Sequence, residues 1–148
     1  MQQLSKLKSR LKRVWRQRRV LFYACISVNL IRLALWLFPF KEVRQVLTAV
    51  SQRWIAPNPS TSVAAIIWSV TVASVYTPWG AKCLVKALAT QLLLNRYGYS
   101  HQLHIGVAMG TASTLEAHAW IEYQGHVIMG ALQDLHRFQP FSNTGVIL

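Results

Sequence analysis

The spacing of the apolar residues changes at Gly98, and this change limits the fold more than any other feature. Between residues 81 and 97 the apolar residues recur at helical intervals, as Leu84, Ala87, Leu88 and Leu92 do. Gly98 supplies a stop signal for a helix that begins near Ala81. The segment before Gly98 is therefore predicted to be helical.

After Gly98 the apolar residues alternate with other residues, which is typical of half-buried strands. This pattern is seen in "LHIGVAM", residues 103–109, and again in "EAHAWIEY", residues 116–123. Gly125 then marks a hairpin turn, and "HVIMGAL" is the predicted returning strand. The sequence therefore predicts an α+β fold with a helical N-terminal part followed by an antiparallel sheet.

The N-terminal region combines positive charge with apolar sequence. Eight of the sixteen Lys and Arg residues lie in the first nineteen positions, and residues 4–19 are predicted to form a basic amphipathic helix. Val20 to Phe40 follows as an apolar run that is long enough to span a bilayer. Arg32 near its middle would cost about 2.5 to 3.5 kcal/mol on insertion scales, so a buried helix is favoured over a span. Peripheral contact with a membrane stays open.

The chain length of 148 residues suits one compact domain with an internal boundary. Ala56 to Ser62, "APNPSTS", reads as a linker because its two prolines cannot continue a helix. It separates a helical region, residues 1–62, from residues 63–148, which begin with a helix predicted over Val63 to Tyr76. The basic and apolar N-terminus resembles a secretory signal, but no small-residue cleavage site follows, so a cytoplasmic protein is expected.

Cys83 is the first candidate for chemistry. It follows Pro78-Trp79-Gly80 and is predicted to lie in the first turn of its helix, where unpaired amides and the helix dipole stabilise a thiolate. A cysteine in an apolar helix can equally be a small core residue. No disulfide is expected between Cys83 and Cys25.

His118 is the second candidate, because it interrupts a segment of core-type residues. On the predicted strand it shares one face with Trp120 and Glu122. The alternative is a buried histidine that is hydrogen-bonded to the backbone. A thiol at a helix start followed by a histidine on a strand is the order in which papain-like and transglutaminase-like enzymes place nucleophile and base, and this pairing favours catalysis.

Other sites are not expected. His101 and His104 are three residues apart on a strand, so they point to opposite faces and do not predict a metal site. The chain has no glycine-rich phosphate loop, and no cofactor is predicted. Trp79 and Trp120 could line a substrate cleft or pack the core.

The segments "CLVKALATQLLLNRYGYSHQLHIGV", "LEAHAWIEYQGHVIMG" and "RFQPF" resemble the lasso-peptide maturation peptidase, the B protein or its stand-alone B2 part, of the transglutaminase-like superfamily. The resemblance covers Pro78 to Phe141. It implies a papain- or transglutaminase-like cysteine peptidase core within residues 63–148, which removes the leader from a ribosomally made precursor peptide. It also implies two partners: a separate leader-recognition protein, and an ATP-dependent cyclase that acts afterwards.

The resemblance also implies roles for individual residues. Cys83 would attack the scissile carbonyl, its backbone amide would bind the oxyanion, and His118 would transfer the proton. The family usually places an aspartate about twelve residues after the histidine, where this chain has Gly130 and Ala131, and neither of these is expected to orient an imidazole. Asp134 is predicted to take this role instead.

Two alternatives remain at this point. A non-enzymatic protein that binds a membrane or nucleic acid would explain the net charge of +12, although nucleic acid is the less expected partner. An acyl transferase or transglutaminase on the same fold would use the same Cys83 and His118, with an amine in place of water.

Overall fold

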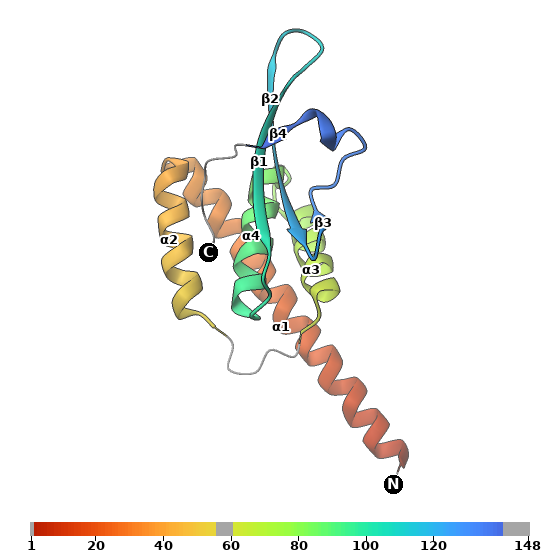
Figure 1. Cartoon of the computed structure of the whole chain (residues 1–148). Coiled ribbons are helices and arrows are strands. Elements are labelled where there is room, and N and C mark those ends of the chain that lie inside the picture. Colours follow the sequence, from red (N-terminus) through yellow and green to blue (C-terminus); the bar gives the residue numbers. More distant parts are fainter. Residues whose placement is uncertain (1, 56–60, 141–148) are drawn as a thin grey trace.

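The computed structural model describes residues 2–55 and 61–140, with side chains from Trp15 onward. Three predicted features lie outside these described parts: residues 56–60 of the predicted linker Ala56 to Ser62, the leucine face of residues 4–14, and the resemblance at Phe141. Within them, four helices are followed by a four-stranded antiparallel sheet, which confirms the α+β prediction (Figure 1).

The helices are α1 (Gln2–Leu37), α2 (Phe40–Arg53), α3 (Val63–Tyr76) and α4 (Cys83–Arg96). The strands are β1 (Gln102–Met109), β2 (Leu115–Tyr123), β3 (His126–Met129) and β4 (Gln139–Pro140), in the spatial order β3-β2-β1-β4. A short 3₁₀ helix, η1 (Leu135–Arg137), precedes β4.

The basic segment and the apolar run form one continuous helix, α1, where the sequence suggested two segments. It ends because Pro39 cannot continue a helix. Its Trp15–Leu37 part is long and apolar enough to cross a membrane, and 28% of the residues in an apolar stretch of 18 residues within it are buried inside the molecule. The expectation of a buried helix therefore holds for one face of α1 only.

Two glycine turns connect the elements that the change of periodicity predicted. At Gly98, φ is +75°, and the amides of Gly98 and Tyr99 bond to the carbonyls of Asn95 and Leu94, which closes the C-terminus of α4. Gln124 and Gly125 both have positive φ, +50° and +76°, as a two-residue hairpin turn between β2 and β3 requires.

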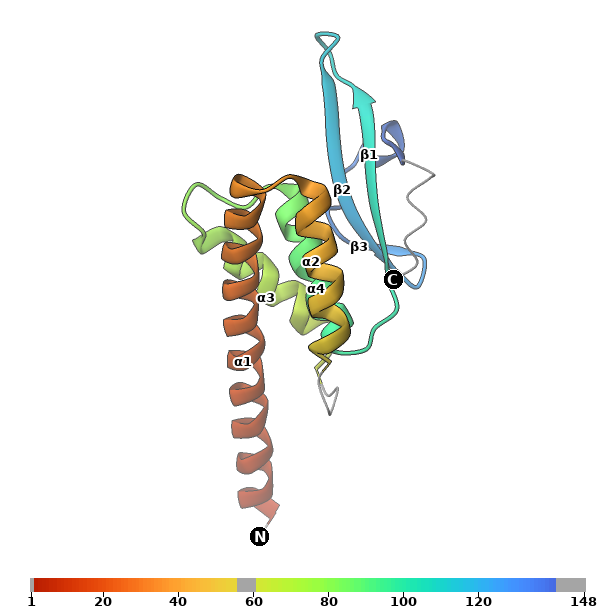
Figure 2. The ribbon, with the colours of Figure 1, turned by 90° about the vertical axis from the view of Figure 1, so that its left-hand side faces the viewer.

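The helices α1–α4 cover one face of the sheet, and η1 lies on the other side (Figure 2). The main core joins α1, α3 and α4 to the inner face of β2, where Ala119 and Ile121 are buried. A smaller cluster on the outer face consists of Ala108, Trp120 and Phe138. One core therefore contains residues from both sides of the predicted boundary at residue 62.

Candidate functional site

Cys83 is the first residue of α4, as predicted. The turn before it uses positive φ at Trp79 and Gly80, and the Gly80 amide donates to the Thr77 carbonyl at 2.9 Å. Cys83 is half-buried and is not in a disulfide, and its thiol makes no hydrogen bond with the described part of the chain. Because the first amides of a helix have no partner within it, they can stabilise negative charge on this thiol or on an oxyanion beside it.

The imidazole of His118 is held in one orientation by three neighbours. Its Nε2 lies 2.7 Å from the carbonyl oxygen of Gly130, and its ring lies against Trp120 and Phe138 with centroids 6.2 and 5.4 Å away. A carbonyl can only accept a hydrogen bond, so Nε2 carries the proton in the neutral ring. Nδ1 is then the nitrogen with a free lone pair, which is the one that could act as a base.

Gly130 brings its carbonyl to His118 in a way that other residues could not. Its φ is +80°, and a Cβ atom there would lie 2.6 Å from the carbonyl oxygen of Ala119 and 3.1 Å from Cα of Trp120. An aspartate therefore does not fit this backbone. The interpretation that neither Gly130 nor Ala131 could orient the imidazole is wrong for Gly130, because it considered side chains and left out the main-chain carbonyl.

Asp134 takes part in a different set of contacts. Its Oδ2 accepts a hydrogen bond from Nε of Arg137 at 2.8 Å, and Arg137 also donates to Glu116 Oε2 at 2.9 Å and to the carbonyl of Met109 at 3.1 Å. The hydrogen bond to Glu116, followed by the contacts with Asp134, raises the pKa of Arg137 above its ordinary value. Asp134 thus helps to fasten η1 to the β1–β2 hairpin, and its predicted catalytic role stays a prediction.

No hydrogen bond joins Cys83 to His118 among the described residues. Side chains alternate along a strand, so His118 shares the outer face of β2 with Trp120, whereas Ala119 and Ile121 face the helices. Cys83 begins α4, which packs on that inner side. The pairing of thiol and imidazole therefore also stays a prediction.

The two predicted cleft tryptophans differ in their surroundings. Trp79 is 93% exposed, and the guanidinium carbon of Arg32 lies 5.4 Å from its ring centroid, which gives Arg32 a partner at the surface. Trp120 is buried between the rings of His104 and His118 on the outer face. Its position is that of a packing residue beside the candidate base.

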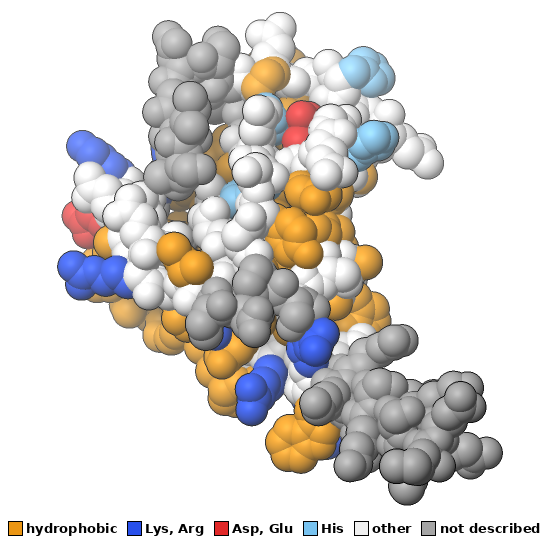
Figure 3. Space-filling view, turned by 60° about the horizontal axis from the view of Figure 1, so that its bottom comes forward, with side chains coloured by type: hydrophobic (Ala, Val, Ile, Leu, Met, Phe, Trp, Pro, Cys, Tyr) orange, Lys and Arg blue, Asp and Glu red, His pale blue; other side chains and the backbone are white. Residues whose placement is uncertain are grey.

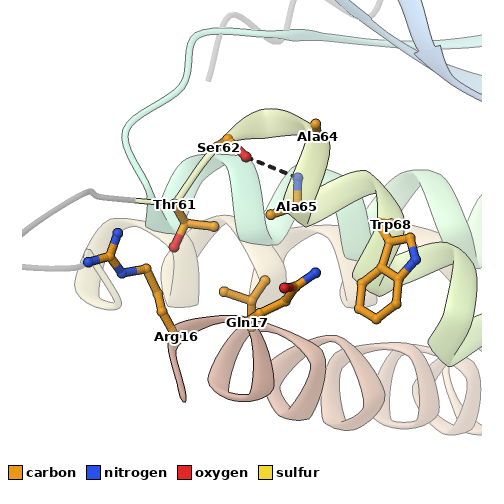
Figure 4. Close-up of a pocket in the computed structure, with 8 residues that line it drawn as sticks. Arg16, Gln17, Thr61, Ser62, Ala64, Ala65 and Trp68 are labelled. Atoms are coloured by element: carbon orange, nitrogen blue, oxygen red, sulfur yellow. Dashed lines mark hydrogen bonds between the residues drawn. The ribbon is translucent and has the colours of Figure 1, made fainter. Parts of the chain in front are cut away.

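Two of the larger cavities lie away from Cys83 and His118. A cavity of about 500 Å³ between α1 and α3 is lined by Arg16, Gln17 and Trp68 among others, next to the point where Ser62 caps α3 (Figure 4). A groove of about 780 Å³ lies between α1 and α2. Neither is lined by a predicted catalytic residue.

Comparison with known families gives one match. Residues 26–143 match the model of the transglutaminase-like superfamily, and the chain belongs to this superfamily. No curated protein and no solved structure matches the chain. The matched region contains both Cys83 and His118. Because transglutaminase-like domains are often cysteine hydrolases or transferases, the family indicates Cys–His hydrolase or transferase chemistry and no specific substrate.

Proposed function

We propose that this chain is a cysteine peptidase that removes the leader from a ribosomally made, lasso-type precursor peptide. The observation that carries the proposal is the 2.7 Å contact between His118 Nε2 and the Gly130 carbonyl. It supplies an orienting acceptor twelve residues after the histidine, where the resemblance implies an aspartate. The same contact would also satisfy a purely structural histidine, so the experiment below separates the two roles.

In the proposed reaction the Cys83 sulfur attacks the scissile carbonyl carbon after its proton passes to Nδ1 of His118. The new C–S bond gives a tetrahedral oxyanion, which backbone amides at the start of α4, that of Cys83 included, would stabilise. The C–N bond then breaks, and the imidazolium gives its proton to the leaving amine. Water hydrolyses the acyl-enzyme, which releases the leader and restores the thiol.

The Gly130 carbonyl would favour the imidazolium less than a carboxylate does, since it carries only a partial negative charge. It would still fix the tautomer and the ring plane. Catalytic contacts in unliganded enzymes are often long and tighten only when substrate is bound. Because the described structure has Cys83 at the start of α4 on the inner side of the sheet and His118 on the outer face of β2, we propose that precursor binding is accompanied by a rearrangement that brings the thiol and the imidazole together.

The test is cleavage of the precursor encoded by a neighbouring gene, with its recognition protein added, followed by mass spectrometry. We expect one cut at the leader–core junction. Cys83→Ala and His118→Ala should each abolish it, with a loss on the order of 10³-fold or more. The matched controls are Cys25→Ala, which removes the other free thiol, and His104→Ala, which removes the other histidine stacked on Trp120.

The controls decide how each result is interpreted. Cleavage that persists in Cys83→Ala, or an equal loss in His104→Ala and His118→Ala, would contradict the proposed roles. An added primary amine that appears covalently joined to the leader would instead favour the transferase alternative, because the acyl-enzyme would then be resolved by an amine. Absence of cleavage by well-folded native protein with its recognition protein present would contradict the peptidase proposal.

A further inference from the structure

One face of α1 exposes large apolar side chains over most of the described helix. Trp15, Phe22, Ile26, Leu30, Leu33 and Trp36 recur at intervals of three, four or seven residues, and each is between 41 and 80% exposed. The opposite face is anchored in the core through Val20, Ala24 and Val28, which are fully buried. The exposed stripe is therefore fixed on the outside of the molecule.

The stripe continues onto α2. Ile26 and Leu30 also line the groove of about 780 Å³ between the two helices, whose other wall includes Val46 and Val50, 62 and 41% exposed. Soluble monomers seldom expose a continuous apolar surface of this kind without a partner. We refer to this surface, formed by the stripe on α1 and the groove beside α2, as the α1–α2 apolar face.

The charge of the protein is concentrated on the same two helices. Residues 1–53 contain twelve of the sixteen Lys and Arg residues and one of the four acidic residues, Glu42, so they carry +11 of the net charge of +12. Arg18, Arg19, Lys41 and Arg53 are exposed on α1 and α2. Figure 3 shows Lys and Arg side chains beside hydrophobic side chains on one face of the molecule.

From this combination we propose that the α1–α2 apolar face binds the surface of an anionic phospholipid bilayer, with α1 lying in the plane of the membrane. Apolar side chains would enter the boundary between headgroups and acyl chains, while the basic residues contact lipid phosphates. Trp15 and Trp36, towards the two ends of the stripe, have amphipathic rings that suit this boundary. The proposal does not depend on the proposed peptidase activity.

Charge distinguishes a bilayer from a second copy of the chain. A symmetric dimer through this face would bring two regions of +11 together, and this repulsion opposes self-association. Anionic headgroups instead attract the same charges. Insertion of α1 across the bilayer is also opposed, because it would remove Val20, Ala24 and Val28 from the core. A helix α1 that lies in the plane of the membrane keeps its packing in the core and also places its basic residues at the anionic headgroups.

The experiment is flotation of the full chain with vesicles of phosphatidylcholine alone and with an equal mixture of phosphatidylcholine and phosphatidylglycerol. We expect binding to the anionic vesicles only, weakened as NaCl rises from about 0.1 M to about 0.5 M. The double variant Leu30→Glu/Leu33→Glu should weaken binding about 30-fold or more, because it removes apolar contact and adds negative charge. Arg18→Gln/Arg19→Gln should weaken it roughly 10- to 30-fold.

The control is Leu115→Glu, which changes a leucine on β2 that is 69% exposed, more than Leu30 and Leu33 at 59 and 50%. It should bind like the native chain, and circular dichroism checks that every variant is folded. Equal binding to both vesicle types, or unchanged binding of the double leucine variant, would overturn the proposal. So would resistance to alkaline carbonate extraction, which indicates a span. Native protein that does not bind vesicles, but forms a dimer or a complex with the recognition protein, would also contradict the proposal. If the double leucine variant disrupted that dimer or complex, the α1–α2 apolar face would be assigned to the protein partner instead.

Discussion

At the scale of single residues, Gly130 has the most demanding backbone position near the candidate base. Its φ of +80° is unfavourable for other residues, and an added Cβ would lie 2.6 Å from the Ala119 carbonyl oxygen. We expect Gly130→Ala to lower the free energy of unfolding by about 2 to 4 kcal/mol, from backbone strain together with overpacking. Urea denaturation measures this loss.

The control for Gly130 is Gly125→Ala. Gly125 has almost the same φ, +76°, but a Cβ there would meet nothing within 4 Å. Its substitution should therefore cost only the backbone strain, about 1 to 2 kcal/mol. Equal losses in the two variants would contradict the claim that a side chain at position 130 clashes with its neighbours. That clash is the reason given for a glycine carbonyl, and no aspartate side chain, beside His118.

His101 makes the stability depend on pH. Burial lowers its pKa below the ordinary value of 6.5, outweighing the hydrogen bond with the Tyr99 carbonyl, which raises it. Below about pH 6.5 the unfolded chain then binds more protons than the folded chain, so the free energy of unfolding falls as the pH is lowered. We expect the urea midpoint to fall between about pH 7 and pH 5, and to fall less in His101→Gln.

His126 is the matched control for His101. It makes the same kind of contact with a carbonyl two residues earlier, Nδ1 to Gln124 at 3.0 Å, but it is exposed. The urea midpoint of His126→Gln is measured at the same pH values as those of the native protein and His101→Gln, so that replacing an exposed histidine can be compared with replacing His101. A pH dependence that is the same in native protein and His101→Gln would show that burial of His101 has no role in it.

At the scale of elements, the start of α3 depends on one side chain. Ser62 is in extended conformation, and its Oγ accepts a hydrogen bond from the Ala65 amide at 3.2 Å. We expect Ser62→Ala to cost about 1 kcal/mol in the free energy of unfolding, because an amide at the helix start loses its partner. Ser100→Ala, at an exposed serine between α4 and β1, is the control and should change stability little.

The helices and strands were largely predictable because their signals are local. The predicted helix over Val63 to Tyr76 matches α3, and Gly98 and Gly125 lie at the turns that periodicity predicted. The two-residue strand β4 was not predicted, since it forms only by pairing with Gly106 and Val107 of β1, far away in the sequence. Local patterns do not contain such pairings.

The candidate site was also predictable only where its signals are local in the sequence. Residue type and spacing indicated Cys83 at a helix start and His118 on a strand, and both are placed there. The orienting acceptor was missed because every residue has a main-chain carbonyl, so the carbonyl of Gly130 gives no signal in the sequence. Which face of the sheet each side chain meets depends on packing, which the sequence pattern alone does not determine.

At the scale of the whole molecule, the main core unites α1 with α3, α4 and the sheet. If the chain unfolds as one cooperative unit, far-UV circular dichroism, dominated by the helices, and tryptophan fluorescence should report the same urea transition. We expect this coincidence, because α1 contributes fully buried residues such as Val28 to the same core as Leu93 of α4 and Ile121 of β2. Separate transitions would contradict unfolding as one cooperative unit.

A core substitution on α1 tests directly whether α1 unfolds together with α4 and the sheet. Val28→Ala removes two methyl groups from a fully buried position, and we expect it to lower the free energy of unfolding by about 1 to 3 kcal/mol. If the core is single, both spectroscopic probes should shift to the same lower urea midpoint. Val75→Ala, at a valine of α3 that is 74% exposed, should shift neither. A shift of only one of the two transitions would contradict a single cooperative core that includes α1, α4 and the sheet.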